Sequence, residues 1–363
     1  LKTRARFRER FWLTYRRVLQ RELEGDPVDF IGRRTQDLML ESKKELAVYL
    51  NAPVEQMVFV PNATYGINVV ARSLQLEAGD EILTTNHEYG AVNNTWRFNF
   101  DKRGVKYINH PIPMPFTTPE AFVDKLWEGV TPRTKVITFS HITSPTALIF
   151  PAELICQRAR AEGILTVIDG AHAPGQIDID LTAMGIDYYT GNCHKWLCSP
   201  KGAAFLYAAP GRDEMLEPLV VSHGWSRPHD EQSKFLDNFN WTGTMDPSAY
   251  ISVGAAVRFQ RENNWPAVRE ACHALASQTR DRINEMTGLA SVCPDSTEWF
   301  SQMFIARLPN ETAEKLREVL WPEFKIEVPL PEWNGDSLVR VSVQAYNSPE
   351  DMERLLSAIE KYL

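Results

Sequence analysis

Several features that define whole classes of protein are missing from this chain of 363 residues. No apolar run approaches the roughly 20 residues that cross a bilayer, and no signal-peptide pattern opens the chain, so we expect no membrane partner. The five cysteines are odd in number and scattered, which predicts reduced thiols and a cytoplasmic location rather than a disulfide framework. The net charge of −8 disfavours nucleic acid as a partner.

What the sequence does contain is an alternation of short β-rich runs with helical patterns. The β-rich runs are 57–60, 81–85, 105–109, 135–140, 164–169, 187–190 and 203–208, and the helical patterns are 64–75, 90–101, 118–128 and 151–162. This spacing predicts an α/β fold with a mainly parallel seven-stranded sheet flanked by helices. The last run follows Ser-Pro-Lys-Gly too closely for a helical crossover, so we expect it to enter the sheet antiparallel.

The pattern also predicts three parts of the chain. The pattern of residues 1–30 predicts an N-terminal helical arm, and that of residues 31–250 predicts a large α/β domain. Residues 251–363 predict a smaller C-terminal α+β domain with a long helical pattern that bends near Pro266. It continues with β-rich runs at 303–308, 324–328 and 338–343 and a closing helix capped by Ser348.

Polar, aromatic and glycine-containing segments follow five of the predicted strands. They are PNATYGIN (61–68), NHEYGA (86–91), HITSPTA (141–147), DGAHAPG (169–175) and GNCHKW (191–196). In an open α/β sheet, ligands bind beyond the carboxyl ends of the strands, so the fold would bring these segments together. The coincidence of five such segments predicts a binding site at this edge.

Three of the segments predict compatible chemistry. Ala63 and Thr64 at a helix start offer N–H groups and a hydroxyl to a phosphate, although a plain N-cap explains them equally well. Asp169 ends an apolar strand, where a carboxylate needs a cationic or N–H partner or caps the next turn. Lys195 can form a Schiff base if burial disfavours its ammonium. Together they describe a site for pyridoxal 5'-phosphate (PLP).

The stretch VIDGAHAPGQIDIDLTAMGIDYYTGNCHKWLCSPKGAAFLY, residues 167–207, resembles the class V aminotransferases, PLP enzymes of fold type I, and among them isopenicillin N epimerase-like proteins. The resemblance implies that Lys195 forms the Schiff base and that Asp169 binds the pyridinium nitrogen. It implies that His172 reaches the phenolic oxygen with Ser144 nearby and that Tyr89 stacks on the ring. The implied phosphate ligands are Ala63, Thr64, Asn192 and His194.

The resemblance also implies a homodimer with its active site at the subunit interface, because Gly243 and Thr244 match a loop that reaches the phosphate of the other subunit. Arg340 matches an arginine that pairs with a substrate α-carboxylate, a task suited to a planar guanidinium. Taken singly, each residue has an ordinary structural explanation, such as a surface ion pair for Arg340. No metal is expected, because Cys193, His194 and Cys198 do not have the spacing of a common zinc site.

The predicted function is a PLP-dependent enzyme that acts on the α-carbon of an amino acid through an external aldimine. Lys195 would be the base for the Cα proton, and epimerisation needs a second acid on the opposite face, for which Tyr89 is a candidate. Transamination and C–S (β) elimination are alternatives, because a fold does not fix the reaction. A regulatory PLP-binding protein without turnover is disfavoured by Arg340, and a desulfurase by the absence of cysteine from residues 325–340.

Overall fold

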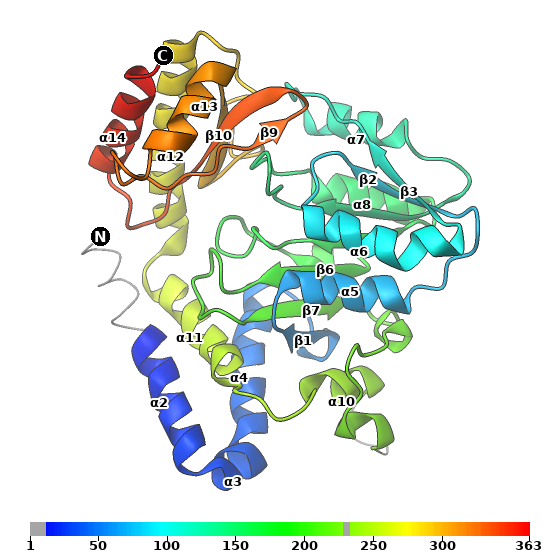
Figure 1. The fold of residues 1–363 in the computed structure, drawn as a ribbon. Helices are drawn as coiled ribbons and strands as arrows, with labels where there is room; N and C mark the ends of the chain where they lie inside the picture. The colour runs from blue at the N-terminus through cyan, green and yellow to red at the C-terminus, as the bar shows by residue number, and fades with distance from the viewer. Residues whose placement is uncertain (1–11, 228–232) are drawn as a thin grey trace.

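The computed structural model describes residues 12–227 and 233–363, and its largest element is a seven-stranded sheet (Figure 1). In sheet order the strands are β1 (Met57–Val60), β7 (Ala204–Ala208), β6 (Tyr188–Asn192), β5 (Leu165–Asp169), β4 (Thr134–Ser140), β2 (Glu81–Thr85) and β3 (Lys106–His110). Neighbours pair in parallel except for β7, which is antiparallel to β6 and β1. The predicted sheet and the antiparallel entry of its last strand are confirmed.

Helices cover both faces of this sheet, and the side chains of each strand alternate between the two faces. The helices are α4 (Thr35–Tyr49), α5 (Ala63–Ser73), α6 (Gly90–Phe100), α7 (Pro119–Trp127), α8 (Ala152–Ala161), α9 (Leu181–Met184) and α10 (Lys234–Asn240). In β5, Val167 packs with Ile67 of α5 and Trp96 of α6, whereas Ile168 belongs to the core that contains Ile155 of α8. Figure 1 shows α5 and α6 in front of the sheet and α8 behind it.

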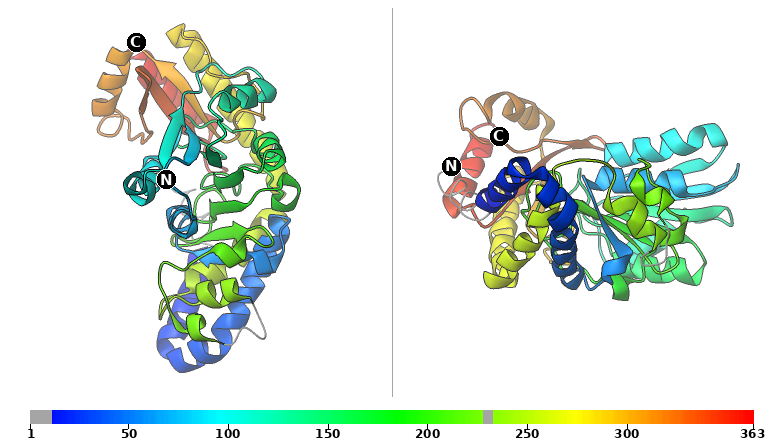
Figure 2. Two further views of the ribbon diagram at one scale, coloured as in Figure 1. Left: turned by 90° about the vertical axis from the view of Figure 1, so that its right-hand side faces the viewer. Right: turned by 90° about the horizontal axis from the view of Figure 1, so that it is seen from below.

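A second, three-stranded antiparallel sheet forms in the C-terminal part. Its order is β8 (Met303–Leu308), β10 (Asp336–Ser342), β9 (Glu332–Trp333), and the accompanying helices are α11 (Ser248–Glu262), α12 (Trp265–Thr287), α13 (Asn310–Val319) and α14 (Pro349–Glu360). Figure 2 shows this sheet at one end of the molecule. The predicted bend near Pro266 is a break between α11 and α12 at Asn264, where φ is 46°. Ser348 caps α14 in a capping box, as expected.

The expected β-rich run at 324–328 is wrong as a strand, since these residues form none. The alternating side chains of Phe324, Ile326 and Val328 pack against the core. Just beyond them, Pro329 and Pro331 accept hydrogen bonds from the backbone of β10, at distances of 3.0 and 2.9 Å. Prolines cannot donate in return, so the chain lies beside β10 without a two-way ladder.

The N-terminal region begins, in the described residues, with α2 (Trp12–Gly25) and α3 (Pro27–Asp29), and a π-helical turn at Phe30–Arg34 leads into α4. Arg16 of α2 donates to Ser248 of α11 at 3.2 Å, which ties the two helices together. Residues 1–11 of the predicted arm lie outside the described residues, and the division at 30 and 250 stays a prediction. Across the described ranges, no helix is both long and apolar enough to cross a membrane.

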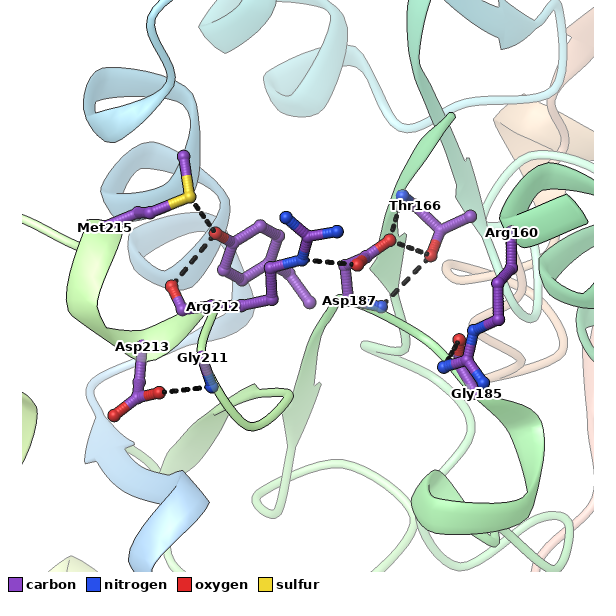
Figure 3. Close-up of polar contacts among 9 residues, drawn as sticks. Arg160, Thr166, Gly185, Asp187, Gly211, Arg212, Asp213 and Met215 are labelled. Atoms are coloured by element: carbon purple, nitrogen blue, oxygen red, sulfur yellow. Dashed lines mark hydrogen bonds and ion pairs between the residues drawn. The ribbon is translucent and has the colours of Figure 1, made fainter. Parts of the chain in front are cut away.

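A polar network ties β5, β6 and the end of β7 together at the amino ends of β5 and β6 (Figure 3). Asp187 accepts hydrogen bonds from the backbone N–H and hydroxyl of Thr166, at 2.8 and 3.1 Å, and from Arg212 Nε at 2.8 Å. Tyr188 donates its hydroxyl to the carbonyl of Arg212. The carboxylate of Asp187 therefore binds donors from two segments, Thr166 of β5 and Arg212 after β7. It lies at the amino ends of the strands, opposite the carboxyl ends that carry the polar segments.

Replacing Asp187 by alanine should lower the free energy of unfolding by about 1–3 kcal/mol, because the N–H of Thr166 and the guanidinium of Arg212 lose their acceptor. Asp178→Ala is the matched control, since Asp178 also pairs with an arginine but its side chain is 94% exposed, and an exposed pair adds little stability. Urea unfolding of both variants measures the difference. Equal stability of the two variants would contradict a structural role for the Asp187 network.

Candidate active site

A cavity of about 140 Å³ opens at the carboxyl ends of β4, β5 and β6. Its lining residues are Ala63, Thr64, Tyr89, Ser140, Ile142, Ser144, Asp169, Ala171, His172, Asn192 and Lys195. Eight of these were candidates from the sequence, whereas Ser140, Ile142 and Ala171 were not. The pairing of Ser140 with Asp169 and of Asp169 with Thr190 explains the convergence, because three adjacent parallel strands end at the same level.

A larger cavity, of about 690 Å³, lies between α4, α8 and α9. Its wall contains the carboxylates of Glu153, Asp178, Asp180 and Glu298, and none of the described lysines or arginines lines it. A cavity with this charge does not suit a phosphate or an α-carboxylate. The smaller cavity, with an amine and a helix N-terminus in its wall, is the candidate active site.

Lys195 is held by a histidine at the floor of this cavity. Its Nζ lies 2.9 Å from His172 Nε2, and His172 Nδ1 accepts a hydrogen bond of 3.2 Å from the indole N–H of Trp196. Burial lowers the pKa of Lys195 to about 8, and Arg340 adds to this effect while Asp169 opposes it. Burial likewise places the pKa of His172 well below 6.5. Burial therefore keeps the ring of His172 neutral and makes the neutral amine of Lys195 more populated near neutral pH than in an ordinary lysine, which suits an amine nucleophile.

Asp169 is the second ionisable group of the cavity. Burial raises the pKa of its carboxyl, against the effect of a hydrogen bond of 2.9 Å from Ala171 N–H to Oδ1 and of the Lys195 charge. Among the described residues this is its one hydrogen bond, so a second donor would relieve the cost of burial. A pyridinium N–H is such a donor, and the residues present fit PLP in this respect.

The N-terminus of α5 forms one end of the candidate site. Asn62 is the N-cap and accepts from Tyr65 N–H, and Asn192 Oδ1 accepts from Ala63 N–H at 2.9 Å. The Thr64 hydroxyl has no hydrogen-bond partner within the described ranges. A Cβ on Gly66 would lie 2.3 Å from Thr190 Oγ1, so the glycine lets α5 approach β6 closely and brings its N-terminus to the cavity. This end of a helix suits an anion.

Tyr89 lines the cavity from the residue before α6, with its side chain 48% exposed. The preceding residue, Glu88, was missed by sequence analysis although it stands in the same segment. It is buried and accepts 2.7 Å hydrogen bonds from Thr85 and Ser140. Burial raises the pKa of Glu88 to about 7 despite these hydroxyls. The carboxyl group thus anchors the segment that carries Tyr89 to a residue of the cavity wall.

Arg340 reaches the cavity wall from β10 of the small sheet. Its Nη1 donates to the carbonyl and the hydroxyl of Ser144, which lines the cavity. Its Nε is buried without a hydrogen-bond partner among the described residues. A half-buried guanidinium with an unused donor is suited to an added carboxylate.

Four predicted site residues are absent from the cavity lining, namely Arg340, which contacts the lining residue Ser144, and His194, Gly243 and Thr244. His194 Nδ1 lies 2.7 Å from the carbonyl of Ala203, and this half-buried ring is absent from the lining. Gly243 and Thr244 lie in the loop before α11 and are also absent from it. Their phosphate-binding roles stay predictions. No group of three or more metal-ligating side chains occurs in the part of the chain that the structure describes.

Comparison with known proteins places the chain in a family. The family model "Aminotransferase class-V" matches residues 28–355. Isopenicillin N epimerase of Amycolatopsis lactamdurans is 36% identical over 95% of this chain and 90% of its own length. A putative L-cysteine desulfhydrase of Oryza sativa is 26% identical over 94% of this chain and 78% of its own length.

The fold is shared with solved structures of low sequence identity. A C-DES variant with glycine covalently linked to its PLP cofactor has a TM-score of 0.79 at 18% identity, covering 97% of this chain and 93% of that one. The chain belongs to the class V aminotransferase family and is an enzyme. PLP, which the resemblance implied, is the cofactor of this family.

The lowered pKa makes the reactivity of Lys195 testable in the cofactor-free protein. The rate of PLP capture should rise with pH and level off above a midpoint of about 8, because only the unprotonated amine attacks an aldehyde. Stopped-flow absorbance across a pH series measures it, and Lys195→Ala should give no such phase. A midpoint near 10.5, the ordinary value for lysine, would show that the fold does not perturb this amine.

Proposed function

We propose that the protein acts at the α-carbon of an amino acid and that its reaction is an epimerisation. The observation that carries the proposal is the amine of Lys195, 2.9 Å from His172 and in one cavity with Asp169. PLP, when bound, would take up the amino group of the substrate and withdraw electrons from its α-carbon, which makes the Cα proton acidic. The identity to isopenicillin N epimerase supports this choice of reaction.

In this proposal the residues of the cavity divide the work. Lys195 would hold the cofactor aldehyde and then take the Cα proton, since its pKa of about 8 suits a base near neutral pH. Asp169 would bind the pyridinium N–H. Tyr89 would return a proton to Cα from the other face, which inverts the configuration. Ala63, Thr64, Asn192 and His194 would bind the phosphate, and His172 and Ser144 would lie near the phenolic oxygen.

A homodimer belongs to the same proposal. Gly243 and Thr244 lie outside the cavity of their own chain, so a phosphate contact would have to come from a second copy. Thr244 is exposed and precedes α11 by a few residues, which leaves it accessible to a partner. A cytoplasmic location remains an expectation from the cysteine content.

A C–S (β) lyase is the second candidate, favoured by the relation to the putative L-cysteine desulfhydrase. It would use the same base and the same carboxylate contact, but it would expel a β-substituent in place of the second protonation. The two functions differ only after the Cα proton has left. Product analysis therefore separates them, and inspection of the cofactor-binding residues does not.

Incubation of the PLP-loaded enzyme with L- and D-amino acids in deuterated water tests the reaction. We expect deuterium at Cα together with inversion, because the second proton would come from a group that exchanges with water. Chiral chromatography and mass spectrometry measure both. Keto-acid formation would identify a transaminase, pyruvate with ammonia a β-lyase, and no turnover of any substrate would reject an enzyme of amino-acid metabolism at this site.

Arg340→Ala should raise KM for the amino acid by about 10- to 100-fold, the loss expected for hydrogen bonds to a charged group, while PLP absorbance stays unchanged. Arg307→Ala is the control, because Arg307 lies on the neighbouring strand β8 and pairs with Asp336 at 2.9 Å. Steady-state kinetics and a PLP titration separate substrate from cofactor effects. An unchanged KM would place the carboxylate contact elsewhere.

A further inference from the structure

The hydrogen bonds around His172 define its protonation state. An indole N–H only donates, so the 3.2 Å contact from Trp196 requires His172 Nδ1 to be an acceptor without a proton. A neutral imidazole then carries its proton on Nε2, the atom that lies 2.9 Å from Lys195 Nζ. The N–H on Nε2 needs a hydrogen-bond acceptor, and Lys195 can accept only as an amine, because an ammonium has no lone pair.

We propose that Trp196 is a positioning residue that fixes His172 as the tautomer with its proton on Nε2, so that His172 donates to Lys195 in its amine form. The inference deepens the proposed function, because the same Nε2–H would be the donor to the phenolic oxygen once PLP is bound. Trp196 itself touches neither the cofactor nor the substrate in this scheme. It acts through His172.

Two segments distant in sequence hold the backbone of Trp196 in place. A Cβ on Gly175 would lie 2.3 Å from the carbonyl carbon of Trp196, and Gly175 has φ of +98°, so the loop after β5 passes directly over this backbone. Gln260 of α11 donates to the carbonyl of Trp196 at 3.3 Å. The backbone of Trp196 is therefore held by two segments distant in sequence, and its side chain is buried, with its N–H donating to His172.

Charged groups from other elements act on the same pair. Asp169 of β5 favours the ammonium form of Lys195, whereas Arg340 of β10 and Lys201 of the turn after β6 oppose it. Burial lowers the pKa of His194, and the charge of the nearby Lys195 lowers it further. None of these groups contacts Nδ1 of His172 by a hydrogen bond among the described residues. Trp196 is the group that selects the tautomer.

Trp196→Phe tests the proposal, because it keeps an aromatic ring and removes the donor. His172 could then carry its proton on Nδ1 and accept from the Lys195 ammonium, which should shift the midpoint of PLP capture upward by about one pKa unit. Trp127→Phe is the matched control, since Trp127 is a buried tryptophan whose N–H donates to Glu162 at 2.7 Å and not to His172. It should leave the midpoint unchanged.

Nitrogen NMR of histidine-labelled, cofactor-free protein gives a readout that does not depend on activity. We expect His172, assigned from its missing signals in His172→Gln, to be protonated at Nε2 in the unmodified protein and to lose this preference in Trp196→Phe. A proton on Nδ1 of the unmodified protein would overturn the proposal, even if the variant failed to fold. Failure of PLP binding would reject the proposed function but would leave this tautomer measurement intact.

Discussion

A buried amine and a buried carboxyl group at one edge of the sheet are the constraint on which the rest of the site depends. Burial acts on them in opposite directions, lowering the pKa of Lys195 and raising that of Asp169, so each is driven toward its neutral form. Their mutual attraction offsets part of this cost. A ligand that offers an aldehyde to the amine and an N–H donor to the carboxylate would relieve both groups at once, and PLP, the cofactor of this family, offers both.

The sheet keeps this chemistry apart from the interactions that hold the strands together. At the amino ends of β5 and β6, Asp187 is saturated by donors from Thr166 and Arg212. At the carboxyl ends, the side-chain carboxyl of Asp169 accepts one hydrogen bond from the described residues and faces a cavity. The two aspartates thus differ in the number of hydrogen bonds that their carboxylates accept, and the one with unused acceptors is the one that we propose to bind the cofactor.

Much of this arrangement could be predicted from the sequence, because alternating strands and helices determine which loops meet at the carboxyl edge. Lys195 and Asp169 followed from that rule, whereas Arg340 required the family resemblance, since it comes from a different sheet. Trp196 was quoted in the motif but its role was missed, because its bond to His172 joins residues 24 apart with no periodic signal. The strand expected at 324–328 failed because the prolines that follow it remove the donors a ladder needs.

The residues that bind a cofactor do not decide between inversion and elimination, and this limits what the motif around Lys195 can predict. In the proposed reaction the decision lies with groups on the substrate side of the cavity. Tyr89 enters from a segment held by the buried Glu88, yet its own side chain is half exposed. A fixed backbone with a half-exposed tyrosine side chain is suited to deliver a proton that exchanges with water. A lyase needs no such donor, so the function of Tyr89 is where the two reactions differ.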